Sequence, residues 1–349
     1  MKALVVTEVG KPLTLITNRQ IHHPGPSQVQ IRVTVAGVNP HDQKCRDRGF
    51  LIADRLPAVL ANDIVGRVTA SAEGVAKYSL GDRIFTQGSS GSGSTQNGLQ
   101  QYALVDVDFS AKIPASISDD EAATLPSNLL APVVAFFHTD TLNFPPPWTP
   151  AASRFDYASQ TVLIIGGGSN CGRLGVQVAA LAGIGRIVVV GGEQAELESY
   201  GATHVLSRHG SEESILARVY DVVGDDLVYA YDAVNDPSEQ HLGVNALSYT
   251  ERGALARLVT SGPPDDTKIR PKPAGYDVKN VYGSSHLYRE FARQFWDMLP
   301  GYLVDGKIKP LTHFEVFEEG LDADKVNEVL DGYRDGKRVV QPHFHVSAG

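Results

Sequence analysis

The sequence predicts an α/β protein in two parts, an irregular β domain followed by a doubly wound parallel sheet. Short β-branched runs separated by turn clusters fill the chain to about residue 124. From residue 160 onward, strand patterns alternate with helix patterns, which is typical of a parallel sheet covered by helices. The length of 349 residues also fits about two domains.

The first part of the chain reads as a series of short strands. We expect strands at residues 2–7, 29–35, 64–69, 82–85 and 101–105. The segment 88–98, GSSGSGSTQNG, predicts a flexible surface loop because it is rich in Gly and Ser. Ser118 and Glu121 match a capping box, so a short helix is expected to begin there.

The stretch from 160 to 192, QTVLIIGGGSNCGRLGVQVAALAGIGRIVVVGG, predicts a strand, a glycine turn, a helix and a second strand. Glycines let backbone amides approach a pyrophosphate, and the helix N-terminus adds a partial positive charge. The strict G-x-G-x-x-G pattern is not met, because Ser169 takes the middle position. A small hydroxyl still fits there and can bond a phosphate. The alternative is a glycine turn that binds nothing.

The α/β rhythm continues beyond this unit. Further strands are expected at residues 201–207, 227–233, 254–260 and 278–283, with helices at 194–200, 212–223 and 238–247. About six strands complete a doubly wound sheet of Rossmann type. The C-terminal part predicts a helix at 287–303, an extended segment at 309–317, a helix at 323–334 and a last strand at 339–346.

A proline-rich stretch, residues 139–159, precedes the glycine-turn unit. Three consecutive prolines exclude a regular helix or a central strand. Two interpretations stay open with equal weight: a loop that folds over a substrate, or a surface excursion.

Composition excludes several classes of function. The net charge of −9 and the absence of a dense basic run argue against nucleic acid and against an anionic membrane. Two cysteines cannot build a disulfide framework, which fits a reducing compartment. Neither a signal peptide nor a membrane-length apolar run is present, so a cytoplasmic, enzyme-like protein is expected.

Several segments together resemble the medium-chain dehydrogenase/reductase superfamily. They are AGVNPHDQK at 36–44, DIVGRVTASAEGVAKYSLGDRIF at 63–85, NGLQQYALV at 97–105, EAATLPSNLLAPVVAFF at 121–137 and GKRVVQPHFHV at 336–346. The chain most resembles the quinone oxidoreductases and the fungal trans-acting enoyl reductases, the latter through GGS-x-x-G and the proline-rich stretch. The resemblance implies a GroES-like catalytic domain at 1–126, a Rossmann nucleotide-binding domain at 127–285, a return to the first domain at 286–349, and an active cleft between the two domains.

Zinc-dependent members of this superfamily use Cys and His ligands, with an open position for the substrate oxygen. By resemblance, the first Cys position falls in Val38-Asn39-Pro40, and the position of the usual Gly-His-Glu falls in Ala61-Asn62-Asp63. The pair His343-Phe-His345 has no acid beside it in the sequence, so no metal site is expected. Without a Lewis acid, hydride transfer to an activated C=C bond is easier than reduction of a lone carbonyl, because the enolate delocalises the charge.

The resemblance places the cofactor on Gly167, Gly168, Ser169, Asn170 and Cys171 at the pyrophosphate, and on Gly191 and Gly192 near the adenosine ribose. Asn235 and Ser284 follow later strands, where ligands bind in such sheets. Glu193 would suit NAD, whereas Arg208 falls near the 2′-phosphate of NADPH. We expect NADPH; the alternative for Arg208 is a solvated surface charge.

The candidate catalytic residues are Asn39, Lys44 and Asn128, of which Asn39 and Lys44 match cleft positions of quinone and enoyl reductases. Asp42 could instead pair with Lys44 and be structural. The threonine of the family falls at Ala131, and the cleft tyrosine is absent, so no proton donor is named and solvent could serve.

Three functions follow from the resemblance. The first is an NADPH-dependent reductase of an activated C=C bond, on a small-molecule or carrier-bound substrate. The second is a quinone oxidoreductase, and the third is a nucleotide-binding protein without redox turnover. A monomer or a homodimer fits each of them.

Overall fold

The computed structural model describes residues 1–89 and 91–347, which divide into two compact units. The first unit comprises Met1–Ser127, Tyr288–Val304 and Pro310–Gly349; the second comprises Asn128–Leu287 and Asp305–Lys309. The chain therefore leaves the first unit twice, first for residues 128–287 and again for the short segment 305–309, and returns each time. Within the described residues, no helix combines the length and the apolar character needed to cross a membrane.

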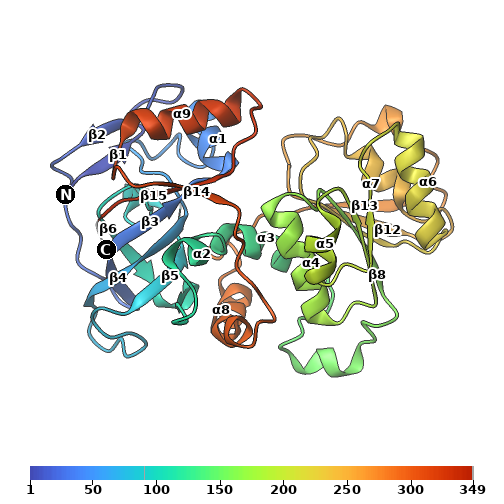
Figure 1. Ribbon diagram of the computed structural model, residues 1–349, viewed down its shortest axis with the longest axis horizontal. Helices are drawn as coiled ribbons and strands as arrows, with labels where there is room; N and C mark the ends of the chain where they lie inside the picture. The colour runs from blue at the N-terminus through green and yellow to red at the C-terminus, as the bar shows by residue number, and fades with distance from the viewer. Residues whose placement is uncertain (90, 348–349) are drawn as a thin grey trace. The chain divides into compact units, whose positions relative to one another are not determined.

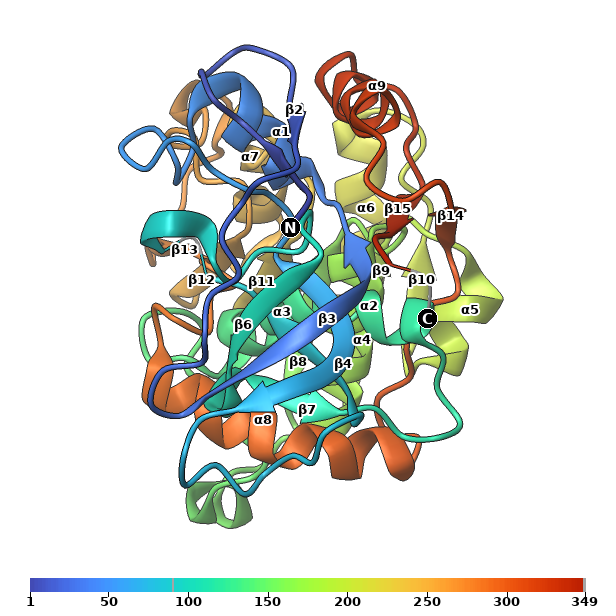
Figure 2. The same cartoon turned by 90° about the vertical axis from the view of Figure 1, so that its left-hand side faces the viewer.

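The first unit is built on a seven-stranded sheet with the order β14-β15-β3-β4-β5-β7, in which β6 also pairs with β3 (Figure 2). Its strands are β3 (Gln28–Gly37), β4 (Asp63–Ser71), β5 (Arg83–Gln87), β6 (Tyr102–Asp106), β7 (Ser110–Lys112), β14 (Phe314–Phe317) and β15 (Gln341–His345). All pairs are antiparallel except β14 with β15. A separate hairpin pairs β1 (Ala3–Val5) with β2 (Thr14–Ile16). The C-terminal strand β15 thus completes a sheet begun near the N-terminus.

Four helices belong mainly to this unit: α1 (Pro40–Arg48), α2 (Asp119–Ala123), α8 (Arg289–Val304) and α9 (Ala323–Arg334). Helix α1 begins directly after β3. Pro40 takes its first position, where no backbone donor is needed, and the Asp42 carboxylate accepts the Asn39 N–H at 2.8 Å. Gly49 ends the helix at φ 69°, a conformation that glycine adopts without steric cost.

The expectation of a flexible loop at residues 88–98 is wrong for its second half; Ser90 lies outside the described residues. Ser94 and Asn97 are buried. The Gln100 side chain donates to the carbonyl oxygens of both, each at 2.9 Å. Buried backbone carbonyls need partners, and one amide supplies them for two residues. This segment is therefore packed because the Gln100 side chain, which lies outside it, satisfies its carbonyl groups.

The second unit holds a six-stranded, all-parallel sheet in the order β10-β9-β8-β11-β12-β13. Figure 1 labels β8, β12 and β13 of this sheet. The strands are β8 (Thr161–Ile165), β9 (Arg186–Val190), β10 (His204–Leu206), β11 (Tyr229–Asp232), β12 (Gly253–Arg257) and β13 (Tyr276–Asn280). Counted along the chain, this order is 3-2-1-4-5-6, that of dinucleotide-binding sheets. The α/β fold class with a doubly wound sheet is confirmed.

Helices α4 (Asn170–Ala182), α5 (Gln194–Ser199), α6 (Glu212–Val223) and α7 (His241–Ala246) connect these strands, and α3 (Pro126–Phe137) leads into the unit. Several ends differ from the expectation. The helix expected at 238–247 begins at His241, and the strand expected at 278–283 ends at Asn280. Propensity locates such elements better than their termini, which depend on caps and tertiary contacts.

The proline-rich stretch 139–159 is a packed part of the second unit. Phe144 is buried, and its ring lies 4.5 Å from that of Tyr229, centroid to centroid. Phe155 and Tyr157 stack edge-on at 4.7 Å, and the Tyr157 hydroxyl donates to the Pro145 carbonyl. Tyr229 is the first residue of β11, so this stretch packs at the amino-terminal edge of the sheet. That edge is opposite the glycine turn, which favours the surface-excursion interpretation over a substrate lid.

Replacing Phe144 with alanine tests this assignment. We expect a loss of about 3–5 kcal/mol in the free energy of unfolding, because a large buried ring leaves a cavity. Nucleotide affinity, measured by fluorescence titration, should not change. Arg154→Ala, at an exposed position of the same stretch, should change stability by less than about 0.5 kcal/mol. A Phe144→Ala protein of normal stability with weakened nucleotide binding would contradict the structural role.

Candidate functional site

Two glycine turns meet at the carboxyl-terminal edge of the parallel sheet. One follows β8 and the other follows β9. A Cβ atom on Gly167 would lie 2.4 Å from the Gly191 carbonyl oxygen, and one on Gly192 would lie 2.9 Å from the Gly167 carbonyl carbon. Both distances are far below van der Waals contact, so neither position accepts a side chain. Gly192 also has a φ of 100°, which favours glycine further.

The turn after β8 leads directly into α4. Asn170 and Cys171 are its first two residues, and Gly172 packs so tightly that a Cβ would lie 2.2 Å from the Gly166 oxygen. Gly168 is exposed, and its N–H has no hydrogen-bond partner among the described residues. A helix N-terminus with an accessible backbone donor is suited to a phosphate.

Ser169 has a different role from the one expected. It caps α4: its Oγ accepts the Gly172 N–H at 3.0 Å and donates to the Gly166 oxygen at 2.8 Å. Because a hydroxyl has a single proton, Ser169 has none left to donate to a phosphate in this arrangement. The serine shapes the turn, while backbone amides remain for the ligand.

Arg173 is a residue that the sequence analysis missed. Its Nε donates to the Glu196 carboxylate of α5 at 2.9 Å, and its Nη1 donates to the Gly168 oxygen at 2.6 Å. One side chain therefore connects the glycine turn to the next helix. The sequence signal for Arg173 is its position, four residues after the N-cap Ser169 and at the start of the second turn of α4.

The two candidate ribose-end residues behave differently. Glu193 caps α5 and accepts the N–H groups of Ala195 and Glu196, which lowers its pKa. Arg208 is exposed, and its side-chain carbons lie 3.3–3.7 Å from the position of a Cβ on Gly191. No hydrogen bond or ion pair involves its guanidinium among the described residues. The Glu193 carboxylate is thus already used to cap α5, whereas the Arg208 guanidinium next to Gly191 is available to a ligand.

The other predicted cofactor residues lie beyond later strands at the same sheet edge. The Asn235 side chain donates to the buried Asp232 carboxylate at 3.0 Å, which holds the turn after β11. Ser284 follows β13, and its Oγ accepts the Leu287 N–H at 3.3 Å. Neighbouring Gly283 touches α3, since a Cβ there would lie 2.9 Å from the Ala131 Cα. The sheet topology brings all these positions to one edge.

Asn128 lies beside the glycine turn. The Cys171 thiol donates to its Oδ1 at 3.6 Å. The Tyr231 hydroxyl is fully buried without a partner among the described residues, and burial raises its pKa well above the ordinary value. Asn128 thus belongs with the cofactor residues of the second unit, while Asn39 and Lys44 belong to the first.

In the first unit, Asn39 is bound to a buried carboxylate. Its Nδ2 donates to Asp63 Oδ2 at 2.7 Å, and the Ser127 N–H donates to Asp63 Oδ1 at 2.7 Å. Asp63 is completely buried, and this burial raises its pKa despite the hydrogen bonds from Asn39 and Ser127. An amide–carboxylate hydrogen bond therefore joins the two segments, 38–40 and 61–63, where the resemblance places ligands of zinc-dependent relatives.

His41 and Asn62 form a second pair that the sequence analysis missed. Asn62 Nδ2 donates to the Gly88 oxygen at 2.7 Å, so its Oδ1 accepts from His41 Nε2 at 3.1 Å. The other ring nitrogen of His41 has no partner among the described residues. Lys44 lies three residues further along α1, on the same side, is half-buried, and forms no ion pair with Asp42 among the described residues. The first turns of α1 thus present an acceptor, His41 Nδ1, and a donor, the Lys44 ammonium.

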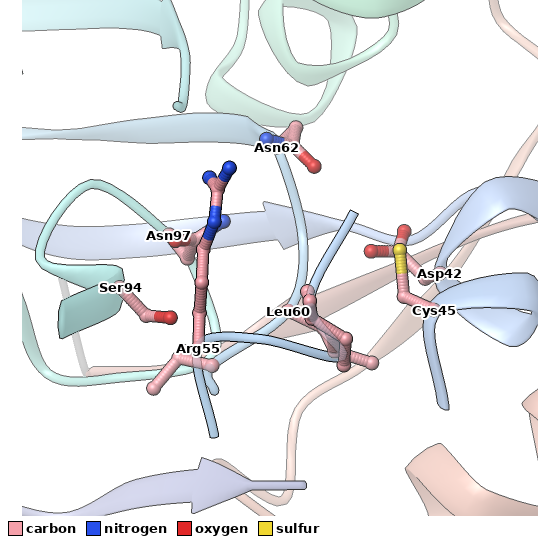
Figure 3. Close-up of a pocket in the computed structure, with 9 residues that line it drawn as sticks. Asp42, Cys45, Arg55, Leu60, Asn62, Ser94 and Asn97 are labelled. Carbon is pink, nitrogen blue, oxygen red and sulfur yellow. The ribbon is translucent and has the colours of Figure 1, made fainter. Parts of the chain in front are cut away.

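A small cavity of about 10 Å³ opens between α1, Asn62 and the 94–97 segment (Figure 3). Its polar lining includes Asp42, Arg55, Asn62, Ser94 and Asn97. The volume corresponds to about one water molecule. In Figure 3 the Arg55 side chain extends past Ser94 and Asn97 toward Asn62.

His343 and His345 do have an acid beside them, which corrects the sequence analysis. Asp120 of α2 lies 3.1 Å from His343 Nδ1 and 3.1 Å from His345 Nε2. Burial opposes ionisation of Asp120, but the two imidazoles outweigh it and lower its pKa. These contacts hold β15 against α2. A search of the described residues finds no group of three or more His, Cys, Asp or Glu side chains arranged to hold a metal.

The raised pKa of Asp63 predicts a pH-dependent stability. Between the ordinary carboxyl pKa of about 4 and its raised folded value, the folded protein binds the extra proton, so stability falls as pH rises. The Asp63→Asn variant has no carboxyl group at this position, so it lacks this loss of stability with rising pH. Its free energy of unfolding relative to wild type, from urea titrations, should therefore increase with pH across this range.

The control is Asp82→Asn, because hydrogen bonds from Lys112 and from the Ser79 N–H lower the pKa of Asp82. Its stability deficit should be complete once pH exceeds about 5 and constant above it. A difference between Asp63→Asn and wild type that does not change with pH would contradict a raised Asp63 pKa.

Comparison with known proteins identifies a domain in the first unit and relatives of the whole chain. Residues 25–115 match the model of the alcohol dehydrogenase GroES-like domain. Trans-enoyl reductase FMN2 of Fusarium mangiferae is 26% identical over 372 residues, covering 93% of this chain and 94% of that protein.

Solved structures agree on the fold over the whole chain. The CurK enoyl reductase superposes with a TM-score of 0.76 at 18% identity, covering 99% of both chains. Mycobacterial Rv1454c, in complex with NADPH, superposes with a TM-score of 0.73 at 20% identity, covering 99% of both chains. The chain therefore contains an alcohol dehydrogenase GroES-like domain within residues 25–115, and over its whole length it has the fold of these solved structures.

Proposed function

We propose that the protein is an NADPH-dependent reductase that transfers hydride to an activated C=C bond, as in an enone or an enoyl thioester. The observation that carries this proposal is the contact between the glycine turns after β8 and β9 at the N-terminus of α4. There, side chains are excluded from Gly167 and Gly192, and the Gly168 N–H is accessible. This arrangement fits a dinucleotide pyrophosphate.

NADPH fits these residues better than NADH does. Gly167, Gly168, Asn170 and Cys171 would hold the pyrophosphate, and Gly191 and Gly192 would face the adenosine ribose. An acid that binds both ribose hydroxyls favours NADH, but Glu193 already caps α5. Arg208 beside Gly191 provides an unpaired guanidinium for a 2′-phosphate. The structure of Rv1454c with NADPH gives related support. When bound, NADPH supplies the hydride.

The reaction is proposed to proceed without zinc. Asn39 and Asp63 lie in the segments 38–40 and 61–63, where the resemblance places ligands of zinc-dependent relatives, and they are hydrogen-bonded to each other at 2.7 Å. An amide and a buried carboxylate with raised pKa are a poor substitute for thiolate and imidazole ligands. An activated C=C bond spreads the developing charge onto its carbonyl oxygen, so hydrogen-bond donors are sufficient to stabilise it.

The first unit offers one such donor on α1, the Lys44 ammonium, whose side chain has no hydrogen bond among the described residues. His41 Nε2 donates to Asn62, so Nδ1 of the neutral ring is an acceptor and not a donor. We assign Lys44 to the substrate oxygen, and Asn39 to positioning through Asp63. Proton delivery to the α-carbon is left to solvent. The name of the FMN2 relative, a trans-enoyl reductase, supports this class of substrate.

Arg208→Ala tests the cofactor. Loss of charge-assisted hydrogen bonds to the 2′-phosphate should raise the Kd for NADPH by about 10–100-fold and leave that for NADH unchanged. Fluorescence titration with both nucleotides measures this effect. Arg186→Ala, at the amino-terminal end of β9, is the matched control and should bind both nucleotides as wild type does. Equal losses for NADPH and NADH would show that Arg208 does not read the phosphate.

NADPH consumption with a panel of acceptors tests the reaction. We expect turnover with enones or enoyl thioesters, slower turnover with saturated ketones, and no effect of a metal chelator. Quinone-dependent consumption without enone turnover would instead indicate a quinone oxidoreductase. Tight NADPH binding with no turnover on any acceptor would indicate a binding protein without redox activity.

A further inference from the structure

The first unit carries a second, basic pocket besides the proposed donor on α1. It is an open cavity of about 540 Å³ lined by Ile16, Asn18, Arg19, Gln20, His22, Arg55, Leu56, Pro57 and Gly93. The lining includes two arginines and one histidine and contains no Asp or Glu. In a protein with a net charge of −9, such a local excess of positive groups is unusual.

Arg19 is fixed in place by neutral acceptors. Its Nε donates to Gln100 Oε1 at 2.8 Å, and its Nη2 donates to the carbonyl oxygens of Gly93 and Ser94. No carboxylate pairs with it among the described residues, and its Nη1 has no partner there. Burial lowers its pKa, which shows that the charge is partly desolvated and not compensated. A fixed, uncompensated guanidinium is preorganised for an anion.

Arg55 lines both this pocket and the small cavity beside α1. Its Nε lies 3.3 Å from Asp54, a side chain that is 78% exposed, so water screens this ion pair. Figure 3 shows the Arg55 side chain beside Ser94, whose carbonyl accepts from Arg19. The two arginines therefore flank the same backbone turn.

The small cavity contains an acceptor that is not satisfied. Asn97 is 3% exposed, and its Oδ1 has no hydrogen-bond partner among the described residues. A buried carbonyl oxygen without a donor is costly, so this position suits a water or a ligand N–H. Asn62, the partner of His41, lines the same cavity. Arg55 is thus shared by the basic pocket and by the polar cavity beside α1.

We propose that the pocket lined by Arg19, His22 and Arg55 binds a phosphate-type oxyanion. Its source is either free phosphate or the phosphate group on a long arm that carries the substrate; the second source rests on the proposed function. Two guanidiniums bind phosphate oxygens through charge-assisted hydrogen bonds, and His22 adds a third donor. A carrier-bound substrate would then be recognised at its anionic end, apart from its reactive end.

Calorimetric titration without any nicotinamide cofactor tests this site. The probes are 4′-phosphopantetheine, pantetheine without the phosphate, and inorganic phosphate, each at low ionic strength. We expect wild type to bind 4′-phosphopantetheine at least about tenfold more tightly than pantetheine, and Arg55→Gln to lose this preference. Arg67→Gln, an exposed arginine of β4 outside the pocket, should keep it. Arg19→Gln should also lose it, with thermal unfolding used to show that the variant is folded.

The probes separate the two sources. Tighter binding of 4′-phosphopantetheine than of inorganic phosphate assigns the site to a substrate arm, while equal affinity assigns it to free phosphate. Equal affinity for phosphorylated and unphosphorylated arms, with no phosphate binding, overturns the proposal. A loss in Arg67→Gln as large as that in Arg55→Gln overturns it as well. Because this experiment measures binding without turnover, its result does not depend on whether the acceptor panel shows NADPH consumption.

Discussion

The second unit depends on the backbone contact between the turns after β8 and β9. Gly167 and Gly192 approach so closely that a single methyl group at either position would meet main-chain atoms. Ser169 stabilises this contact by capping α4, and Arg173 connects it to α5 through a hydrogen bond to Glu196. The result is a cradle of backbone donors that is formed before any ligand binds, so little ordering cost remains for binding.

In the first unit, the corresponding constraint is the buried Asp63 carboxylate at the start of α1. Relatives that use zinc concentrate charge on a metal, whereas this chain places Asn39 against the buried Asp63. The buried carboxylate, held also by the Ser127 N–H, fixes the start of α1 and so the positions of His41 and Lys44. The Lys44 donor on this short helix suits an acceptor whose charge is already delocalised. The proposed chemistry therefore follows from what stabilises α1.

Sequence reasoning predicts the parts that are determined locally. The strand–turn–helix pattern around Gly167 predicts the nucleotide unit, because close backbone approach requires glycine wherever it occurs. Other features depend on distant residues. The 88–98 segment packs because Gln100 satisfies its carbonyls, and the proline-rich stretch packs because Phe144 meets Tyr229. Composition alone suggests mobility for both. The His41–Asn62 pair and the contact of Asp120 with His343 likewise join segments that no local pattern relates.

The proposed reaction delivers hydride to the β-carbon of an activated C=C bond. The most direct measurement uses NADPH deuterated at the nicotinamide C4 with an enone acceptor, and locates the label in the product by NMR. We expect deuterium on the β-carbon, a solvent-derived proton on the α-carbon, and an intact carbonyl. Deuterium on the carbonyl carbon, with formation of an alcohol, would contradict it.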